Sequence, residues 1–184
     1  MKLKWLATAI LLLVGAIALY LVWLDWLGHR YDSVIRVAAE RYGLDPALVK
    51  AVAWRESRFD SNARGKAGEL GLMQIRAEAA REWAMAEGIG GFEHEHCIDP
   101  GTNTLAASWY LRKALGRYGR SEDDPVPYAL AEYNAGRKHV LRWRTGAAET
   151  NSAAFVEQIS FPTTSNYVRQ IMSRRGSYAR DFQK

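Results

Sequence analysis

The feature that most constrains this chain is an uncharged apolar run near its N-terminus, from Trp5 to Leu24. As a helix, 20 residues extend about 30 Å, which is enough to cross a bilayer. Lys2 and Lys4 precede the run, and aromatic rings that favour a membrane interface lie near its two ends. We therefore expect residues 1–28 to form one N-terminal transmembrane helix, with the remainder of the chain, 29–184, as a separate domain.

A cleaved signal peptide is the alternative, because Ala16-Ile17-Ala18 offers a small-x-small cleavage site after a short apolar core. The apolar run continues past that site as far as Leu24, which favours an anchor over a signal. Lysines on the N-terminal side place that end in the cytoplasm. With either an anchor or a cleaved signal, we expect the domain to lie outside the inner membrane.

Composition narrows the class of the exported domain. The chain has 184 residues and a net charge of +5, so residues 29–184 suit a single domain of ordinary size and a polyanionic neighbourhood. No basic stripe with interleaved aromatics and no helix-turn-helix or finger spacing is found, so we expect no nucleic-acid partner. Residues 92–97 look superficially like a metal tract, but a polar loop leading into the single cysteine, Cys97, is the simpler interpretation, and we expect no metal site.

Periodicity and capping signals predict a mainly helical, compact domain. Asp45 can cap a helix and Pro46 fits its first position, so this start is the sharpest in the chain. Glycine and polar residues dominate 60–71, which predicts a loop in which a strand or hairpin could lie. The expected helices are 31–42, 47–59, 72–86, 103–118, 125–133, 138–143 and 165–175.

One carboxylate is out of place in the second of these helices. At about 100° per residue, Glu56 falls inside the apolar arc defined by Leu48, Val49 and Val52, whereas Lys50 falls outside it. Burial disfavours the charged form of a carboxyl and raises its pKa, as a general acid near neutral pH requires. A glutamate that reaches solvent or pairs with a neighbouring arginine is the alternative.

Four motifs, in order along the chain, resemble the lytic transglycosylases of the soluble (SLT) type in the lysozyme-like superfamily. The first motif comprises residues 56–59, which match E-S-x-F, a glycine-containing loop, and residues 71–74, which match G-L-M-Q. Residues 99–111 are similar to D-P-x-x-N-I-x-x-G-x-x-Y-L, 133–136 read Y-N-A-G, and 159–168 are similar to I-P-x-x-E-T-x-x-Y-V. The sequence departs from the family pattern at Gly65, Glu69, Arg76, Ser160 and Thr163, where serine, alanine, proline, proline and glutamate are usual.

The resemblance implies a predominantly α-helical lysozyme-like domain with little strand. It also implies cleavage of the β-1,4 bond between N-acetylmuramic acid and N-acetylglucosamine in peptidoglycan, with formation of a 1,6-anhydro ring. Glu56 would be the single catalytic acid and base, and no metal, nucleotide or redox cofactor is called for. By the same resemblance, the glycan-binding residues are Ser57, Met73, Gln74, Tyr133, Asn134 and Tyr167.

Each of these residues has a purely structural alternative. Met73 could be a core residue, Gln74 a solvated helix residue, and Asn134 only the end of its helix. Tyr133 could be a packing residue whose hydroxyl finds a backbone partner.

Two rival functions remain open. A hydrolytic muramidase would need a second carboxylate, for which Asp60 and Glu69 are the nearby candidates. A non-catalytic peptidoglycan-binding scaffold of an envelope complex is the other. The expected partners are peptidoglycan strands, the inner membrane through the N-terminal helix, and an envelope protein complex, with the catalytic domain in the periplasm.

Overall fold

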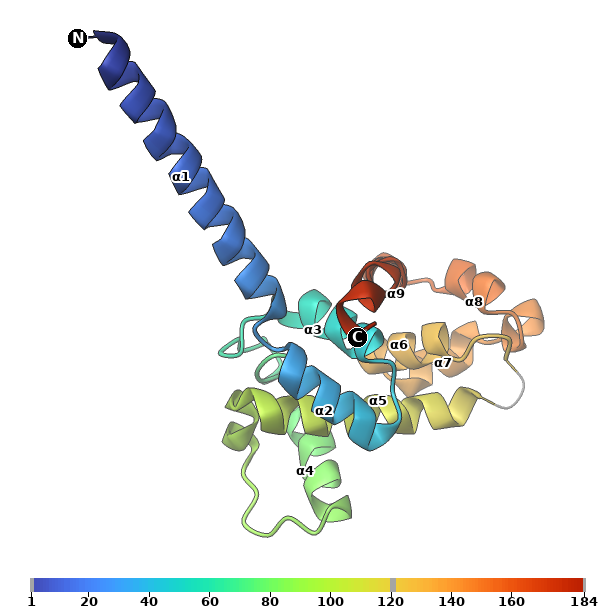
Figure 1. Ribbon diagram of the computed structural model, residues 1–184. Helices are drawn as coiled ribbons and strands as arrows, with labels where there is room; N and C mark the ends of the chain where they lie inside the picture. The colour runs from blue at the N-terminus through green and yellow to red at the C-terminus, as the bar shows by residue number, and fades with distance from the viewer. Residues whose placement is uncertain (1, 120–121, 184) are drawn as a thin grey trace. The chain divides into compact units, whose positions relative to one another are not determined.

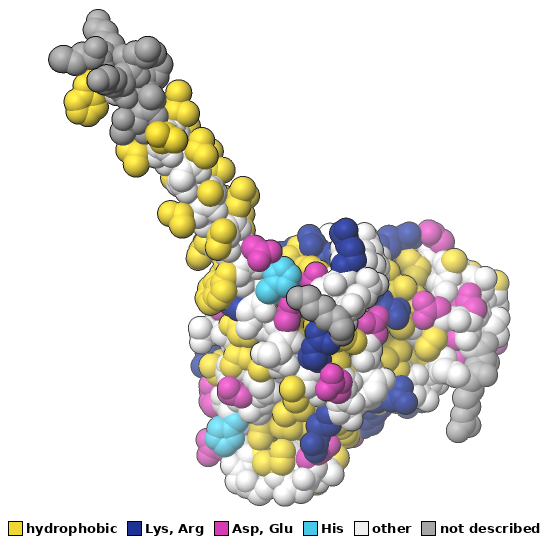
Figure 2. All heavy atoms as spheres, viewed as in Figure 1, with side chains coloured by type: hydrophobic (Ala, Val, Ile, Leu, Met, Phe, Trp, Pro, Cys, Tyr) yellow, Lys and Arg dark blue, Asp and Glu magenta, His cyan; other side chains and the backbone are white. Residues whose placement is uncertain are grey.

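The computed structural model describes residues 2–119 and 122–183, and it divides the chain into two compact units that meet between Ser33 and Val34. The first contains α1 (Lys2–His29), 28 residues whose described side chains are apolar and exposed along most of their length, as Figure 2 shows. Among the described residues, one helix is long and apolar enough to span a membrane, and it lies near the N-terminus. Met1 and the side chains of Lys2 and Lys4, on which the expected orientation depends, lie outside the described residues.

The second unit is helical, and no strand is formed by the residues that the structure describes (Figure 1). Its helices are α2 (Asp32–Tyr42), which begins at the boundary, α3 (Pro46–Ser57), α4 (Ala77–Ala86), α5 (Pro100–Tyr118), α6 (Val126–Ala135), α7 (Arg137–Trp143), α8 (Ser152–Gln158) and α9 (Pro162–Tyr178). Short 3₁₀ helices η1 (His94–Ile98), η2 (Gly146–Glu149) and η3 (Ala179–Phe182) connect or follow them. The expected helical fold is confirmed, whereas α8 and the 3₁₀ helices had no clear sequence signal.

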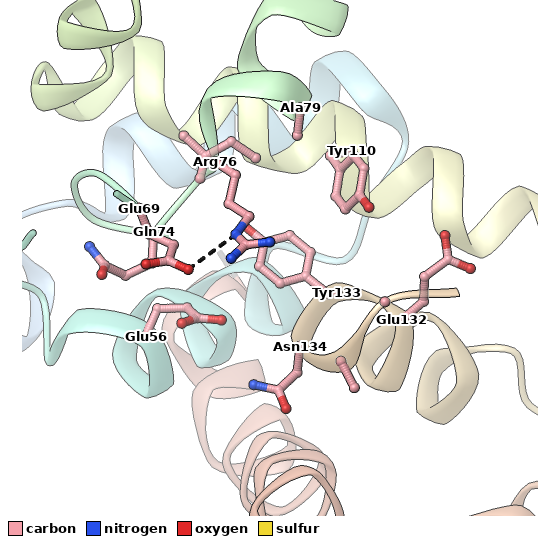
Figure 3. Close-up of a pocket in the computed structure, with 12 residues that line it drawn as sticks. Glu56, Glu69, Gln74, Arg76, Ala79, Tyr110, Glu132, Tyr133 and Asn134 are labelled. Atoms are coloured by element: carbon pink, nitrogen blue, oxygen red, sulfur yellow. Dashed lines mark hydrogen bonds and ion pairs between the residues drawn. The ribbon is translucent and has the colours of Figure 1, made fainter. Parts of the chain in front are cut away.

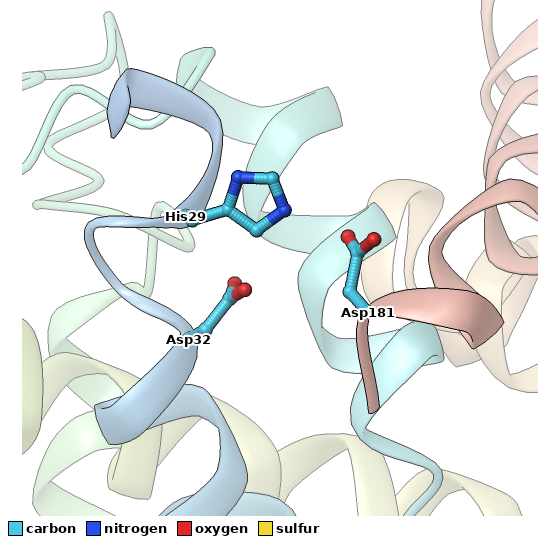
Figure 4. A group of neighbouring side chains, drawn as sticks. All are labelled: His29, Asp32 and Asp181. Atoms are coloured by element: carbon cyan, nitrogen blue, oxygen red, sulfur yellow. The ribbon is translucent and has the colours of Figure 1, made fainter. Parts of the chain in front are cut away.

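Helix α3 is the central element of the domain and packs against α9 and η3. Asp45 caps it, because its carboxylate accepts from the Ala47 N–H at 2.9 Å. Every residue from Ala47 to Ala53 is buried, including Lys50, which the helical-wheel argument wrongly placed outside the buried face. The ammonium of Lys50 donates to Asp181 Oδ2 at 2.7 Å, so this buried charge is paired. Figure 4 shows the side chain of Asp181, which lies on η3.

Helix α3 ends at Ser57, two residues earlier than expected. Arg58 and Phe59 adopt left-handed backbone conformations, with φ of 56° and 65°, and the Arg58 N–H donates to the Trp54 carbonyl at 2.9 Å. Asp60, a candidate for the second carboxylate of a muramidase, is therefore not on the helix that carries Glu56.

Residues 58–76 form a tight loop rather than the start of the expected helix 72–86. Leu70 makes isolated antiparallel bridges to Arg64 and Ile75, and Gln74 has a left-handed φ of 51°, so α4 begins only at Ala77. The strand or hairpin considered for this region is thus reduced to these isolated bridges.

The side chain of Asn103, on α5, fixes this loop. Its Oδ1 accepts from the Met73 N–H at 2.8 Å, and its Nδ2 donates to the carbonyls of Leu70 and Cys97 at 2.8 and 2.7 Å. The amide is fully buried and satisfied on both ends. Gly71 lies directly against it, because a Cβ added there would approach Asn103 Nδ2 to 2.3 Å and the Cys97 carbonyl to 2.4 Å.

We predict that Gly71→Ala destabilises the domain much more than Gly68→Ala. Both glycines have positive φ, 74° and 84°, so each alanine costs about 1 kcal/mol of backbone strain. An added Cβ at Gly68 meets no atom within 4 Å, whereas that at Gly71 overlaps the Asn103 amide and should cost about 2 kcal/mol more. Chemical denaturation of both variants measures the difference, and equal losses would contradict this account of the loop.

Candidate active site

A cleft of about 550 Å³ opens beside the C-terminal end of α3 (Figure 3). The loop 58–76 and the start of α4 form one wall, and α5 and α6 form the opposite wall. Two carboxylates, one guanidinium and two tyrosines face it. The lining residues are Glu56, Glu69, Gln74, Ile75, Arg76, Ala79, Tyr110, Glu132, Tyr133, Asn134, Ala135 and Gly136.

Glu56 lies in the last turn of α3, and one oxygen of its carboxyl is held from α9. The Tyr167 hydroxyl donates to Glu56 Oε1 at 2.6 Å, and the Arg55 guanidinium lies over the Tyr167 ring, 5.3 Å from its centroid. Tyr167 itself is buried, so its role is to orient the carboxyl from behind the cleft. Its contact with glycan stays a prediction.

Burial raises the pKa of Glu56 from 4.5 to about 7. The hydrogen bond from Tyr167 and the charge of Arg55 act in the opposite direction, and the negative charge of Glu69 adds to the increase. Glu56 is thus available both as a proton donor and as a proton acceptor near neutral pH, and the raised pKa predicted from the sequence is confirmed.

Tyr133 is on α6 and lines the wall of the cleft opposite the loop 58–76. Its hydroxyl donates to the Met73 carbonyl at 2.8 Å, and its ring meets that of Tyr110 edge to face, with centroids 5.7 Å apart. Burial, followed by the charge of Glu56, raises the pKa of Tyr133 well above 10, so the hydroxyl stays protonated. Tyr133 therefore couples α6 to the loop as well as lining the cleft.

The structure places Met73 and Ser57 behind the cleft wall rather than on it. The Met73 side chain is fully buried, and its backbone carries the contacts with Asn103 and Tyr133. The Ser57 hydroxyl donates to the Leu72 carbonyl at 2.7 Å, which ties the end of α3 to the loop. Neither side chain is among those that line the cleft, so the expectation that Met73 lines it is not met by its side chain.

Gln74 and Asn134 do line the cleft. Gln74 Nε2 donates to the carbonyls of Ala63 and Gly71 at 3.0 and 2.9 Å, which fixes the side chain against the loop. Asn134 Oδ1 accepts from the Thr164 hydroxyl of α9 at 2.8 Å. Their part in glycan binding stays a prediction, but both are held in place on the cleft surface.

Two departures from the family pattern lie next to each other in the loop. Glu69 occupies the space beside Gly65, because a Cβ at residue 65 would meet Glu69 Oε2 at 2.2 Å and Gln74 Oε1 at 2.8 Å. The serine usual at position 65 would therefore require the carboxylate end of Glu69 to shift. Both departures are visible in the sequence, but their proximity is not, because it depends on the turn of the loop.

Other lining residues were missed. Glu132 is nearly fully buried and is paired with Arg117 and Tyr118 of α5, so it links α5 to α6. Tyr110 appeared only as part of a motif. Glu132 directly precedes the Y-N-A-G motif, and a charged residue inside an otherwise apolar helix was the available signal.

The tract 92–97 has structural contacts of its own. His94 Nε2 is hydrogen-bonded to the Ile75 carbonyl at 3.0 Å, and His96 Nδ1 accepts from the Glu93 N–H at 3.2 Å. Cys97 is buried, which raises the pKa of its thiol to about 12 and disfavours the thiolate that binds metals. The structure brings these residues to the back of the loop, and none of them lines the cleft.

Solved structures define the class of this fold. The lytic transglycosylase Slt of Pseudomonas aeruginosa superposes with a TM-score of 0.75 at 25% identity, over 83% of this chain and 24% of that one. The 70 kDa soluble lytic transglycosylase of Escherichia coli superposes with a TM-score of 0.71 at 26% identity, over 83% of this chain and 24% of that one. The domain thus has the helical lysozyme-like fold that these enzymes contain.

Residues 33–156 match the family described as the transglycosylase SLT domain, and the chain belongs to this family. Membrane-bound lytic murein transglycosylase C of Klebsiella pneumoniae subsp. pneumoniae is 32% identical over 124 residues, which cover 65% of this chain and 34% of that protein. The protein of the same name from Pectobacterium atrosepticum is 33% identical over 124 residues, which cover 65% of this chain and 35% of that protein. The chain therefore spans about a third of the length of these relatives.

We predict that Glu56→Gln stabilises the domain in a pH-dependent way. Below pH 4.5 the carboxyl is neutral in both the folded and unfolded chains, so the substitution should have little effect. Between about pH 4.5 and 7 the unfolded glutamate ionises while the folded one does not, which costs the wild type stability as pH rises. At pH 7.5 the variant should be more stable by about 1–3 kcal/mol.

Urea denaturation at pH 4.5 and 7.5 measures this difference. Glu149→Gln, at an exposed glutamate of η2, is the matched control and should show no such gain. A Glu56→Gln effect that is equal at both pH values would contradict a raised pKa at this carboxyl.

Proposed function

We propose that this protein is a peptidoglycan lytic transglycosylase that cleaves the bond between N-acetylmuramic acid and N-acetylglucosamine and leaves 1,6-anhydro-muramoyl ends. The observation that carries the proposal is Glu56, a carboxyl with a pKa of about 7 facing an open cleft. Membership of the SLT family and the names of the relatives, lytic murein transglycosylases, support the same activity.

In this mechanism Glu56 serves both half-reactions. Its protonated carboxyl gives the proton to the glycosidic oxygen as the bond to C1 breaks, which releases the N-acetylglucosamine side as an alcohol. The resulting carboxylate then takes the proton of the muramoyl 6-hydroxyl as that oxygen bonds to C1. The carboxyl is restored, and no water is consumed. Tyr167, which donates to Oε1, holds the carboxyl in one orientation throughout.

Hydrolysis by a muramidase mechanism is the second candidate, and Glu69 is the observation that favours it. This carboxylate lines the same cleft as Glu56, whereas Asp60 does not and instead accepts from the Asn62 N–H at 2.9 Å. Glu69 is engaged by Arg76 (Figure 3), an arrangement that suits a fixed charge better than a free nucleophile or base. We therefore rank hydrolysis below the transglycosylase reaction, and a non-catalytic scaffold below both.

The proposed location is the inner membrane, crossed once by α1, with the domain from residue 29 onward in the periplasm. The length and apolar surface of α1 support an anchor, and the relatives are named as membrane-bound. The proposed partners are peptidoglycan strands and the membrane, with recruitment by an envelope complex as a further proposal. A secreted form cleaved after residue 18 is the alternative.

We predict that Glu56→Gln lowers turnover of purified peptidoglycan by about 10⁴-fold or more, because a positioned acid or base contributes about 10²- to 10⁴-fold and one group serves both steps. Mass spectrometry of the released sugar ends measures this. Anhydro ends from the wild type support the transglycosylase, reducing ends support the muramidase, and no release supports the scaffold. Asp60→Asn is the control and should retain most activity.

For topology, we predict that protease added to intact spheroplasts digests the domain, because the lysine-flanked end of α1 should remain in the cytoplasm. Western blotting with an antibody to the C-terminus reads the result. Protection of the domain would reverse the orientation, and a mature N-terminus at Leu19 would replace the anchor with a cleaved signal.

A further inference from the structure

Arg76 stands where the family usually has proline, and its side chain faces the cleft. It lies at the residue before α4, is 59% exposed, and its Nε donates to Glu69 Oε1 at 3.1 Å (Figure 3). Among the described residues that line the cleft, Arg76 is the one cation. Its two terminal nitrogens form no hydrogen bond or ion pair with any described residue.

Glu69 is itself well fixed, so it can hold Arg76 in one direction. Its Oε2 accepts from the Ala67 N–H at 3.0 Å, and its side chain is 23% exposed. Burial acts to raise its pKa, but the backbone hydrogen bonds and Arg76 outweigh burial and keep the pKa below 4.5. Glu69 is therefore ionised across the neutral range, and the absent side chain at Gly65 leaves it the space it needs.

We propose that Arg76, positioned by Glu69, is a carboxylate-binding subsite of the cleft. A guanidinium is planar and presents separate edges to its partners. With Nε engaged by Glu69, the edge formed by the two terminal nitrogens can receive both oxygens of a carboxylate in parallel, the geometry that arginine favours for carboxylates. A lysine would supply the same positive charge but not the two parallel hydrogen bonds.

The ligand follows from the proposed function, on which this inference rests. The muramoyl sugar bears a lactyl group that ends in a carboxyl, which is free in stripped glycan and joined to an acidic peptide stem in intact peptidoglycan. Either source supplies a carboxylate close to the sugar that Glu56 would attack. Arg76 would thus favour muramoyl over unsubstituted N-acetylglucosamine units near the cleavage point.

Binding affinities in a Glu56→Gln background test the subsite without turnover. Isothermal titration would use three soluble ligands: glycan fragments with stems, amidase-stripped fragments with a free lactyl carboxylate, and stripped fragments whose carboxyl is converted to a methylamide. Adding Arg76→Gln should weaken binding of a carboxylate ligand by about 10- to 100-fold, the value of a charged hydrogen-bonded pair. On the neutral methylamide it should change the Kd less than twofold.

Matched variants separate the paired hydrogen bonds of the guanidinium from its positive charge. Arg76→Lys should recover only part of the lost affinity, and Arg81→Gln, at an exposed arginine of α4 away from the cleft, should have no effect. Glu69→Gln should weaken carboxylate binding by less than Arg76→Gln. In otherwise wild-type protein Glu69→Gln should raise KM by a larger factor than it lowers kcat, as expected of a residue that positions Arg76. A loss confined to kcat would give Glu69 a chemical role and overturn that part of the proposal.

The outcomes distinguish the sources and the two proposals. Loss on the stripped fragments identifies the lactyl carboxylate, and loss on the stem-bearing fragments alone identifies the stem. Equal loss on the neutral methylamide, or no measurable binding of any ligand before Arg76 is changed, would overturn the subsite. If the wild type releases no anhydro ends while the Arg76 effect persists, the proposed reaction fails and the subsite stands.

Discussion

The buried amide of Asn103 is the interaction on which the arrangement of the active site depends. It holds Leu70, Met73 and Cys97 by their backbones at once, and so fixes a loop that has almost no regular structure of its own. The Met73 carbonyl in turn anchors Tyr133 from the opposite wall. A polar group this deeply buried is costly unless satisfied, and here every donor and acceptor of the side chain is used.

The helical class, the family and the raised pKa of Glu56 could all be predicted from the sequence. The picture of α3 that led to the Glu56 prediction was nevertheless wrong in one respect. The helical wheel assumed one buried face, whereas α3 is buried on all sides over its first two turns, and Lys50 is as buried as its apolar neighbours. Charge pairing with Asp181, far along the chain, decides that burial, and no local pattern encodes it. Capping at Asp45 was predictable because it is local.

The loop and the roles of its residues could not be predicted for a similar reason. Periodicity favoured a helix at 72–86. The pairing of Leu70 with Ile75 and the contacts of Gln74 instead produce a left-handed turn, which a local pattern does not describe. Motif matching gave Met73 a place in the cleft, because a motif records which residues recur and not which way they point. The proximity of the Glu69 carboxylate to Gly65 likewise depends on the three-dimensional path of the loop.

The burial of Cys97 determines how reactive its thiol is once the domain has folded. Disulfide exchange begins with a thiolate that can reach its target, and this thiol is both enclosed and held protonated by a pKa of about 12. Once folded, the domain therefore holds an unpaired cysteine that is protected from cross-linking to another chain. The same packing that supports the Asn103 contact thus shields the one sulfhydryl group of the sequence from oxidation.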